Sequence, residues 1–202
     1  MRAEDFFHKF TVTTTQREKL FGYTDLLLQW NNNINLIGRS TAEDIWQRHI
    51  LDSAALLAHI PDSSCRIADL GSGAGLPGVI LAILSDNPIT LIESSGKKAT
   101  FLQEVKNKLG LEYTLAHCRI EKLIPEEKFD IITARAVAEL QTLWSWSHEI
   151  RKDTAIGIFL KGEQAEQEFQ ALSPDIDRKI TPHPYGQGHI ITLQTLQSAG
   201  KI

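Results

Sequence analysis

Apolar side chains near the start of the chain recur at helical spacing. The first such stretch carries Leu20, Thr24, Leu27 and Leu28, and the second carries Ile45, Trp46, Ile50, Leu56 and Leu57. Residues 15–18 (Thr-Gln-Arg-Glu) and 40–43 (Ser-Thr-Ala-Glu) have the form of capping boxes, so each is expected to begin a helix. Pro61 is expected to end the last helix. Residues 1–62 are therefore predicted to form a small N-terminal helical region.

From Cys65 onward the pattern changes to short apolar runs that alternate with helical periodicity. The predicted strands are 65–70, 89–93, 112–117, 129–134, 155–161 and 189–196, and the predicted helices are 76–85, 96–109, 138–149 and 163–172. Strands that alternate with helices indicate βαβ units and a parallel sheet covered on both faces.

The end of the chain breaks this alternation. The apolar runs 176–180 and 189–196 are separated by residues 182–188, which are too few for the crossover that parallel strands need. The fold class is therefore α/β, with a Rossmann-like, mostly parallel sheet that ends in a C-terminal antiparallel hairpin. Residues 63–202 are predicted to form this α/β domain.

Composition narrows the function classes only slightly. The 202 residues carry a formal net charge of −4, which argues weakly against a nucleic-acid partner but leaves room for a local basic patch. No apolar run approaches the roughly 20 residues of a membrane span, and no signal peptide is evident, so we expect a cytoplasmic protein with no membrane partner. We also expect a monomer. Two cysteines, Cys65 and Cys118, are too few for a disulfide framework or a zinc site, so we expect reduced thiols and no metal.

The most informative segment is the glycine-rich run at residues 69–78 (Asp-Leu-Gly-Ser-Gly-Ala-Gly-Leu-Pro-Gly). It follows a predicted strand and precedes a predicted helix. Glycines remove the Cβ atoms that would block a ligand, and a helix N-terminus offers unpaired N–H donors. This arrangement is typical of a nucleoside-binding loop.

The loop alone does not distinguish between two nucleoside cofactors. Residues 73–78 fit the dinucleotide pattern G-x-G-x-x-G, and Glu93 lies about 20 residues further on, where an acid holds ribose hydroxyls in such folds. Both features suit NAD and S-adenosylmethionine equally. Asp69 is expected to face the mouth of the loop, where it would repel a pyrophosphate and attract the cationic methionine end of S-adenosylmethionine. The simpler alternative is that Asp69 caps the next helix and Glu93 is a surface acid.

Several motifs together resemble a known family. Residues 69–75 resemble the first motif of class I S-adenosylmethionine-dependent methyltransferases, and their extension by 76–78 resembles the glucose-inhibited-division B (RsmG) family of bacterial 16S ribosomal RNA guanine-N7 methyltransferases. Further matching segments are Trp30-Asn31, Asn35-Leu36, Arg48 to Ser53, Glu93-Ser94, Lys97-Lys98, Phe101-Leu102, Arg119 to Glu121, Phe129-Asp130, Ala134 to Ala136 and Lys161-Gly162. The family usually has aspartate where this chain has Glu93.

The resemblance implies that residues 63–202 are a methyltransferase domain that binds S-adenosylmethionine, with contacts from Gly71, Leu76, Ile120, Glu121 and Arg135. The interpretation of the loop and of its charges adds Asp69, Gly73, Gly75 and Glu93 to the expected cofactor site. It also implies that the substrate is 16S rRNA or the small ribosomal subunit, methylated at N7 of a guanine in the 530 loop. Because N7 carries a lone pair and no proton, the reaction needs no general base, and we assign no catalytic acid or base.

Substrate contacts are expected from Arg135, Lys161 and His49. A cation bonded to O6 would orient a guanine whose N7 faces the methyl group. His49 shares a face with Ile45 and Ile50, so a hydrogen-bonded structural role is the competing interpretation. Arg135 has a competing role as well, in an ion pair with Glu139.

Two other functions stay open on the residues alone. A class I methyltransferase that acts on a protein or a small molecule would fit the acidic composition. A nucleotide-binding module without catalysis would fit the glycine loop.

Overall fold

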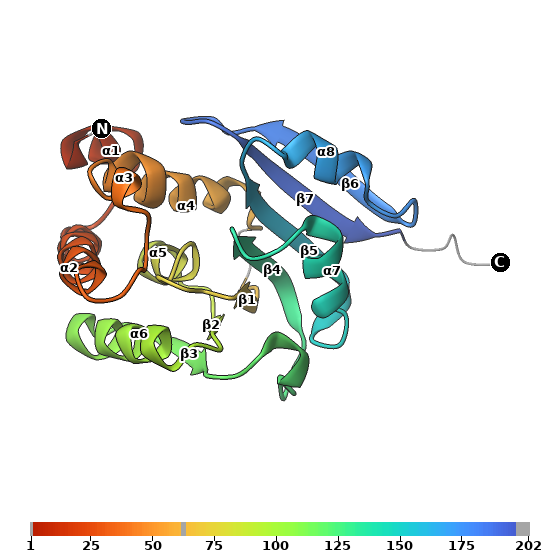
Figure 1. The fold of residues 1–202 in the computed structure, drawn as a ribbon, viewed down its shortest axis with the longest axis horizontal. Helices are drawn as coiled ribbons and strands as arrows, with labels where there is room; N and C mark the ends of the chain where they lie inside the picture. The colour runs from red at the N-terminus through yellow and green to blue at the C-terminus, as the bar shows by residue number, and fades with distance from the viewer. Residues whose placement is uncertain (1, 62–63, 197–202) are drawn as a thin grey trace.

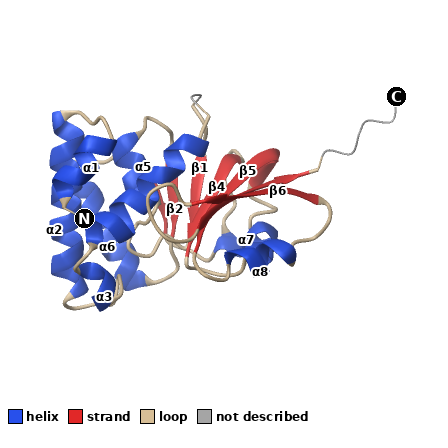
Figure 2. Cartoon of the chain, turned by 90° about the horizontal axis from the view of Figure 1, so that it is seen from above, coloured by secondary structure: helices blue, strands red, loops and turns tan. Residues whose placement is uncertain are grey.

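The computed structural model describes residues 2–61 and 64–196. Its elements form three layers, with a twisted sheet between two groups of helices (Figure 1). Seen from above, α1, α2, α5 and α6 lie on one side of the sheet, and α7 and α8 lie on the other (Figure 2). The predicted α/β architecture, with helices on both faces of the sheet, is confirmed.

The N-terminal region is helical, as predicted. It contains α1 (Ala3–Lys9), α2 (Thr14–Asn31), α3 (Arg39–Ala42), a π-helical turn (Trp46–Leu51), α4 (Asp52–Ala54) and a 3-10 turn (Ala55–His59). The first predicted capping box is displaced by two residues, because Thr13 caps α2 and pairs reciprocally with Gln16. The second is wrong: α3 begins after Gly38, and no side chain caps it.

Within residues 2–61 and 64–196, seven strands form one sheet in the order β3-β2-β1-β4-β5-β7-β6. The strands are β1 (Ile67–Leu70), β2 (Ile89–Ile92), β3 (Tyr113–Ala116), β4 (Phe129–Arg135), β5 (Arg151–Lys161), β6 (Ile176–Pro182) and β7 (His189–Thr195). The first five pair in parallel, and β7 is antiparallel to both β5 and β6. The hairpin predicted from the short connection at residues 182–188 is therefore confirmed.

The remaining helices lie close to their predicted positions. They are α5 (Gly78–Leu84), α6 (Gly96–Leu109), α7 (Leu140–Trp146) and α8 (Ala165–Gln170), with a 3-10 turn at Ile120–Lys122. Helix α6 is followed by Gly110, whose φ of 55° is the left-handed conformation common just after a helix. β5 begins four residues before its predicted start, because Arg151 pairs with Phe129 before a bulge interrupts the ladder.

Each face of the sheet has its own hydrophobic core. Ile67, Leu91 and Ile131 face the N-terminal helices, α5 and α6, while Leu70, Ile132 and Phe159 face α7 and α8. Phe6 and Leu27 are fully buried in the first core, so the N-terminal helices pack against the sheet domain. Among the described residues, no helix combines the length and the apolar character that crossing a bilayer would need.

Candidate functional site

The glycine loop follows β1 at the carboxyl edge of the parallel strands. β1 lies between β2 and β4, so the chain order reverses beside this loop, and ligands of open α/β sheets bind at such a reversal. Gly71, Gly73 and Gly75 have φ values of 60°, 58° and 88°, which side chains other than glycine adopt at a cost. The loop is anchored to β2 by a 3.0 Å hydrogen bond that the Ser72 amide donates to the Ile92 carbonyl.

The three glycines differ in what would meet a side chain at each position. A Cβ atom on Gly71 would lie 2.9 Å from Val137, and one on Gly75 would lie 2.4 Å from Val79, so both glycines permit close packing within the protein. A Cβ atom on Gly73 would meet only the Gly71 carbonyl oxygen, at 3.7 Å. Gly73 therefore lines open space above the loop, and this space suits a nucleoside cofactor.

Glu93 lies directly beside this loop. It follows β2 and is 5% exposed, which rules out the surface acid considered from the sequence. One carboxylate oxygen accepts a hydrogen bond from the Gly73 amide at 2.8 Å, and the other accepts from the Ser95 amide at 2.7 Å. These two hydrogen bonds hold the loop. Each oxygen keeps a second lone pair, so Glu93 can still accept hydrogen bonds from ribose hydroxyls.

Asp69 is placed differently from the expectation. Its side chain is fully buried below the loop, where it accepts hydrogen bonds from the Gly78 amide at 3.2 Å and the Thr133 hydroxyl at 3.0 Å. The prediction that it faces the mouth of the loop is wrong, because the first turn of α5 and β4 enclose it. Burial raises the pKa of Asp69 from 3.8 to about 7, and the hydrogen bonds only partly oppose this shift.

This buried carboxyl should make folding stability depend on pH. Between its ordinary pKa and about 7, the folded state keeps a proton that the unfolded state loses, so the free energy of unfolding falls as pH rises. At about 1.4 kcal/mol per pH unit, the loss from pH 5 to pH 7 is about 2–3 kcal/mol. Asp69→Asn, which still accepts a hydrogen bond from the Gly78 amide, should remove this decline.

Urea unfolding at pH 5, 6, 7 and 8 measures the free energy of unfolding, with the exposed Asp177→Asn as control. Parallel pH profiles for wild type and Asp69→Asn would contradict the assignment.

The remaining residues implied for the cofactor lie around the same edge. Leu76 is 8% exposed at the end of the loop, and Ile120, equally buried, begins the 3-10 turn that follows β3. Glu121 is exposed in that turn. Tyr23, which the sequence did not indicate, reaches from α2 and donates a 2.7 Å hydrogen bond to the Ala74 carbonyl. Its only sequence signal was an aromatic residue on the buried face of a helix.

A cavity of about 830 Å³ lies beside the glycine loop, past the carboxyl ends of β4 and β5. It is lined by the end of β4 at Arg135, by Lys161 and the three residues after it, by Asp44 and Asp52, and by the β6–β7 connection. Ala136 lines it in the left-handed conformation, with φ of 54°, a strain that clusters at functional sites. The next residue, Val137, contacts Gly71, so one short segment links the cavity and the loop.

Arg135 is central to this cavity. Its side chain is 20% exposed, and Nη2 donates a 2.5 Å hydrogen bond to the Arg48 carbonyl. Asp52 lies 3.7 Å from Nη2, so the ion pair forms with Asp52, not with the Glu139 considered from the sequence. Burial raises the pKa of the Asp52 carboxyl, and the charge of Arg135 opposes that shift. His183, only 7% exposed, lies 3.7 Å from the other Asp52 oxygen.

The other two residues predicted to contact substrate have structural partners. Lys161 lines the cavity, but its ammonium lies 2.7 Å from Glu168 and donates to the Ala138 carbonyl. His49 is buried, and its Nε2 lies 2.9 Å from the Thr41 hydroxyl. Burial and the charges of Arg135 and Arg48 lower its pKa to about 3, so it is neutral near pH 7.

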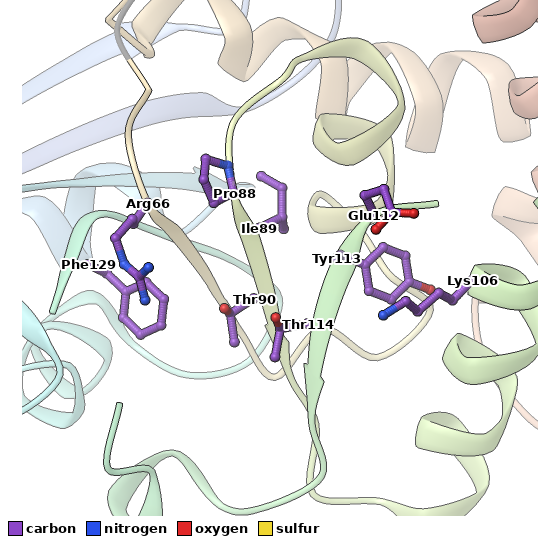
Figure 3. A pocket seen from close by; sticks show the side chains of 9 residues that line it. All are labelled: Arg66, Pro88, Ile89, Thr90, Lys106, Glu112, Tyr113, Thr114 and Phe129. Carbon is purple, nitrogen blue, oxygen red and sulfur yellow. The ribbon is translucent and has the colours of Figure 1, made fainter. Parts of the chain in front are cut away.

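A second, smaller pocket of about 250 Å³ lies at the amino ends of the parallel strands. Arg66 stands beside the Phe129 ring there, and Thr90 and Thr114 project from neighbouring strands (Figure 3). This pocket lies at the opposite edge of the sheet from the glycine loop. Ligands of open α/β sheets bind at the carboxyl ends of the strands, so the expected nucleoside site lies at the other edge.

Known proteins resemble this chain along most of its length. The profile of a family described as rRNA small subunit methyltransferase G matches residues 16–180. The chain is 43% identical over 165 residues to the ribosomal RNA small subunit methyltransferase G of Gluconobacter oxydans. This match covers 82% of this chain and 84% of that protein. It is 41% identical to the protein of the same name from Rhodospirillum centenum, over 91% of this chain and 84% of the relative.

Among solved structures, the ribosomal protein L11 methylase of Lactobacillus delbrueckii is similar with a TM-score of 0.60 and 18% identity. The match covers 73% of this chain and 77% of that one. The expected class I methyltransferase fold is confirmed by this likeness.

Proposed function

Because this chain belongs to the rRNA small subunit methyltransferase G family, we propose that it transfers a methyl group from S-adenosylmethionine to N7 of a guanine in the 530 loop of 16S rRNA. The observation that carries the proposal is the joint placement of two sites. A glycine loop with open space above Gly73 and a cavity with buried charged groups lie at the carboxyl ends of adjacent strands.

The residues around the loop suit the cofactor. Backbone at Gly71, Gly73 and Gly75 would lie under it, Leu76 and Ile120 offer apolar surface, and Glu93 offers lone pairs to the ribose. Glu121 and Arg135 complete the proposed set, with Asp69 supporting the loop from below. S-adenosylmethionine, when bound, supplies a methyl group on a positively charged sulfur.

The role of the protein is then mostly one of orientation. Guanine N7 has no proton to lose, so no side chain has to act as a base. A neutral, buried His49 that lies outside the cavity lining agrees with this view. The acceptor base has to leave its stack to enter the cavity, as other base-modifying enzymes require. We expect Arg135 to donate a hydrogen bond to O6 of that base, because Arg135 and Lys161 both line the cavity.

A methyl-transfer assay tests the proposal. Purified protein and S-adenosylmethionine with a labelled methyl group are incubated with small ribosomal subunits, naked 16S rRNA or cell lysate protein. Label is expected in the rRNA, and site-specific replacement of the acceptor guanine by 7-deazaguanine should abolish it, because that base lacks the N7 lone pair. Label in protein alone would favour the protein-methyltransferase alternative, and methylation of the 7-deaza RNA at the normal rate would contradict N7 as acceptor. Failure to bind S-adenosylmethionine, with NADH bound instead, would support the nucleotide-binding alternative.

A further inference from the structure

Several polar groups in the cavity beside Arg135 have no partner within the protein. Among the described residues, buried side-chain atoms without a hydrogen bond include Nη1 of Arg135, Nε2 of His183 and Nδ1 of His189, and all three residues line this cavity. Leaving a buried donor unpaired costs about 1–3 kcal/mol. Three such atoms around one cavity indicate that a polar ligand completes their hydrogen bonds.

Asp52 lies between Arg135 and His183. Arg135 Nη2 and His183 Nε2 each stand 3.7 Å from one of its carboxylate oxygens, which is too far for a hydrogen bond. The Tyr185 amide donates to Nδ1 of His183 at 3.3 Å, so the imidazole carries its proton on Nε2, the atom nearest Asp52. Within residues 2–61 and 64–196, no hydrogen bond reaches the Asp52 carboxylate. A carboxylate that is 17% exposed thus keeps its lone pairs available inside the cavity.

The chemistry of this group fits one nucleobase. Guanine presents N1–H and N2–H₂ as two adjacent donors, with the acceptor O6 beside them. A carboxylate accepts two parallel hydrogen bonds from such a pair, and a guanidinium nitrogen donates to the neighbouring acceptor. On the same edge, adenine and cytosine place a ring acceptor beside their amino group, and uracil has a single donor. Guanine N7 lies on the opposite side of O6 and stays free.

We propose that Asp52 selects the acceptor base by accepting hydrogen bonds from N1–H and N2–H₂ of guanine, while Nη1 of Arg135 donates to O6. This inference rests on the proposed function and assigns Asp52 as its specificity-determining residue. The cavity volume of about 830 Å³ accommodates a purine base. His183, whose Nε2 lies 3.7 Å from Asp52, places a further donor beside the carboxylate.

The experiment compares acceptor RNAs that differ at one base. Methyl transfer to small-subunit RNA with guanine at the acceptor position is compared with transfer to RNA with inosine there, which keeps N1–H, O6 and N7 but lacks the 2-amino group. Wild type is expected to methylate guanine at least about 10-fold faster than inosine, because one of two hydrogen bonds is lost. Asp52→Asn should lose activity on guanine far more than on inosine, so that the guanine-to-inosine ratio falls to about 3 or less. Glu163→Gln, an exposed carboxylate on the same cavity, should keep the wild-type ratio.

The outcomes separate this inference from the proposed function. No transfer by wild type to guanine-containing RNA would contradict the proposed function itself. Transfer to guanine with equal rates on inosine would leave the function standing and overturn the role of Asp52. Equal loss on both RNAs in Asp52→Asn, which a merely structural role predicts, would overturn it as well. Asp52→Ser is the second variant if Asp52→Asn does not fold, and the same criterion applies to its ratio.

Discussion

Gly73→Ala is expected to weaken S-adenosylmethionine binding by about 50-fold or more, which is about 2.3 kcal/mol, while the protein stays folded. The new methyl group would meet no protein atom closer than the Gly71 carbonyl oxygen, at 3.7 Å. It would therefore project into the space proposed for the cofactor. Only the positive φ of 58° costs stability, by about 1 kcal/mol. Equilibrium titration with S-adenosylmethionine measures the affinity, and urea unfolding measures the stability.

Gly110→Ala is the matched control for this variant. Gly110 has a φ of 55°, and a Cβ atom there would have nothing within 4 Å, so its alanine variant carries the same backbone cost. It lies after α6, away from the glycine loop. Both variants should lose similar stability, but Gly110→Ala should bind S-adenosylmethionine like wild type. Equal affinities in the two variants would contradict the placement of the cofactor over Gly73.

Arg135→Ala is expected to lower methyl transfer to small-subunit rRNA by about 100-fold or more, which corresponds to about 2.7 kcal/mol of transition-state stabilisation. The guanidinium is proposed to donate a hydrogen bond to O6 of the acceptor base, and its removal also deprives Asp52 of the arginine that lies 3.7 Å from it. Orientation supplies most of the catalysis in this reaction, so loss of the orienting group acts directly on the rate. The ratio kcat/KM for RNA is the quantity to measure.

Two further variants interpret that result. Lys179→Ala removes an exposed cation on β6, and it should leave activity near the wild-type level. Arg135→Lys keeps a positive charge but loses the planar fork of donors, so an intermediate activity is expected. If Arg135→Ala and Lys179→Ala were equally active, Arg135 would have no role in transfer.

The elements that the sequence predicted well are those with strong local signals. Helix α6 occupies its predicted range of 96–109, because its apolar residues keep helical spacing and Gly110 ends it. The hairpin at the C-terminus followed from the length of one connection. The helix starts near Thr13 and Gly38 were misplaced, because several Ser and Thr residues compete for the same cap and the packing of the helix decides between them.

The site was predicted only in part. Glu93 lies beside the glycine loop because β2, which precedes Glu93, is the next strand in the chain and pairs in parallel with β1. Parallel neighbours end at the same edge of a sheet. The burial of Asp69 was missed, since the direction of its side chain depends on α5 and β4 together. Tyr23 and His183 carry no motif of their own, and each reaches the site from a distant part of the chain.

By itself, the sequence determined the α/β class, the glycine loop and the acid that follows it, because these depend on local periodicity and on residues close together in the chain. The tertiary structure decided which charges meet. Asp52, Arg135 and His183 come from an N-terminal helix, a central strand and a C-terminal loop, and only the folded chain brings them within 3.7 Å. It also decided that Asp69 supports the loop from below, because burial depends on everything that packs around a residue.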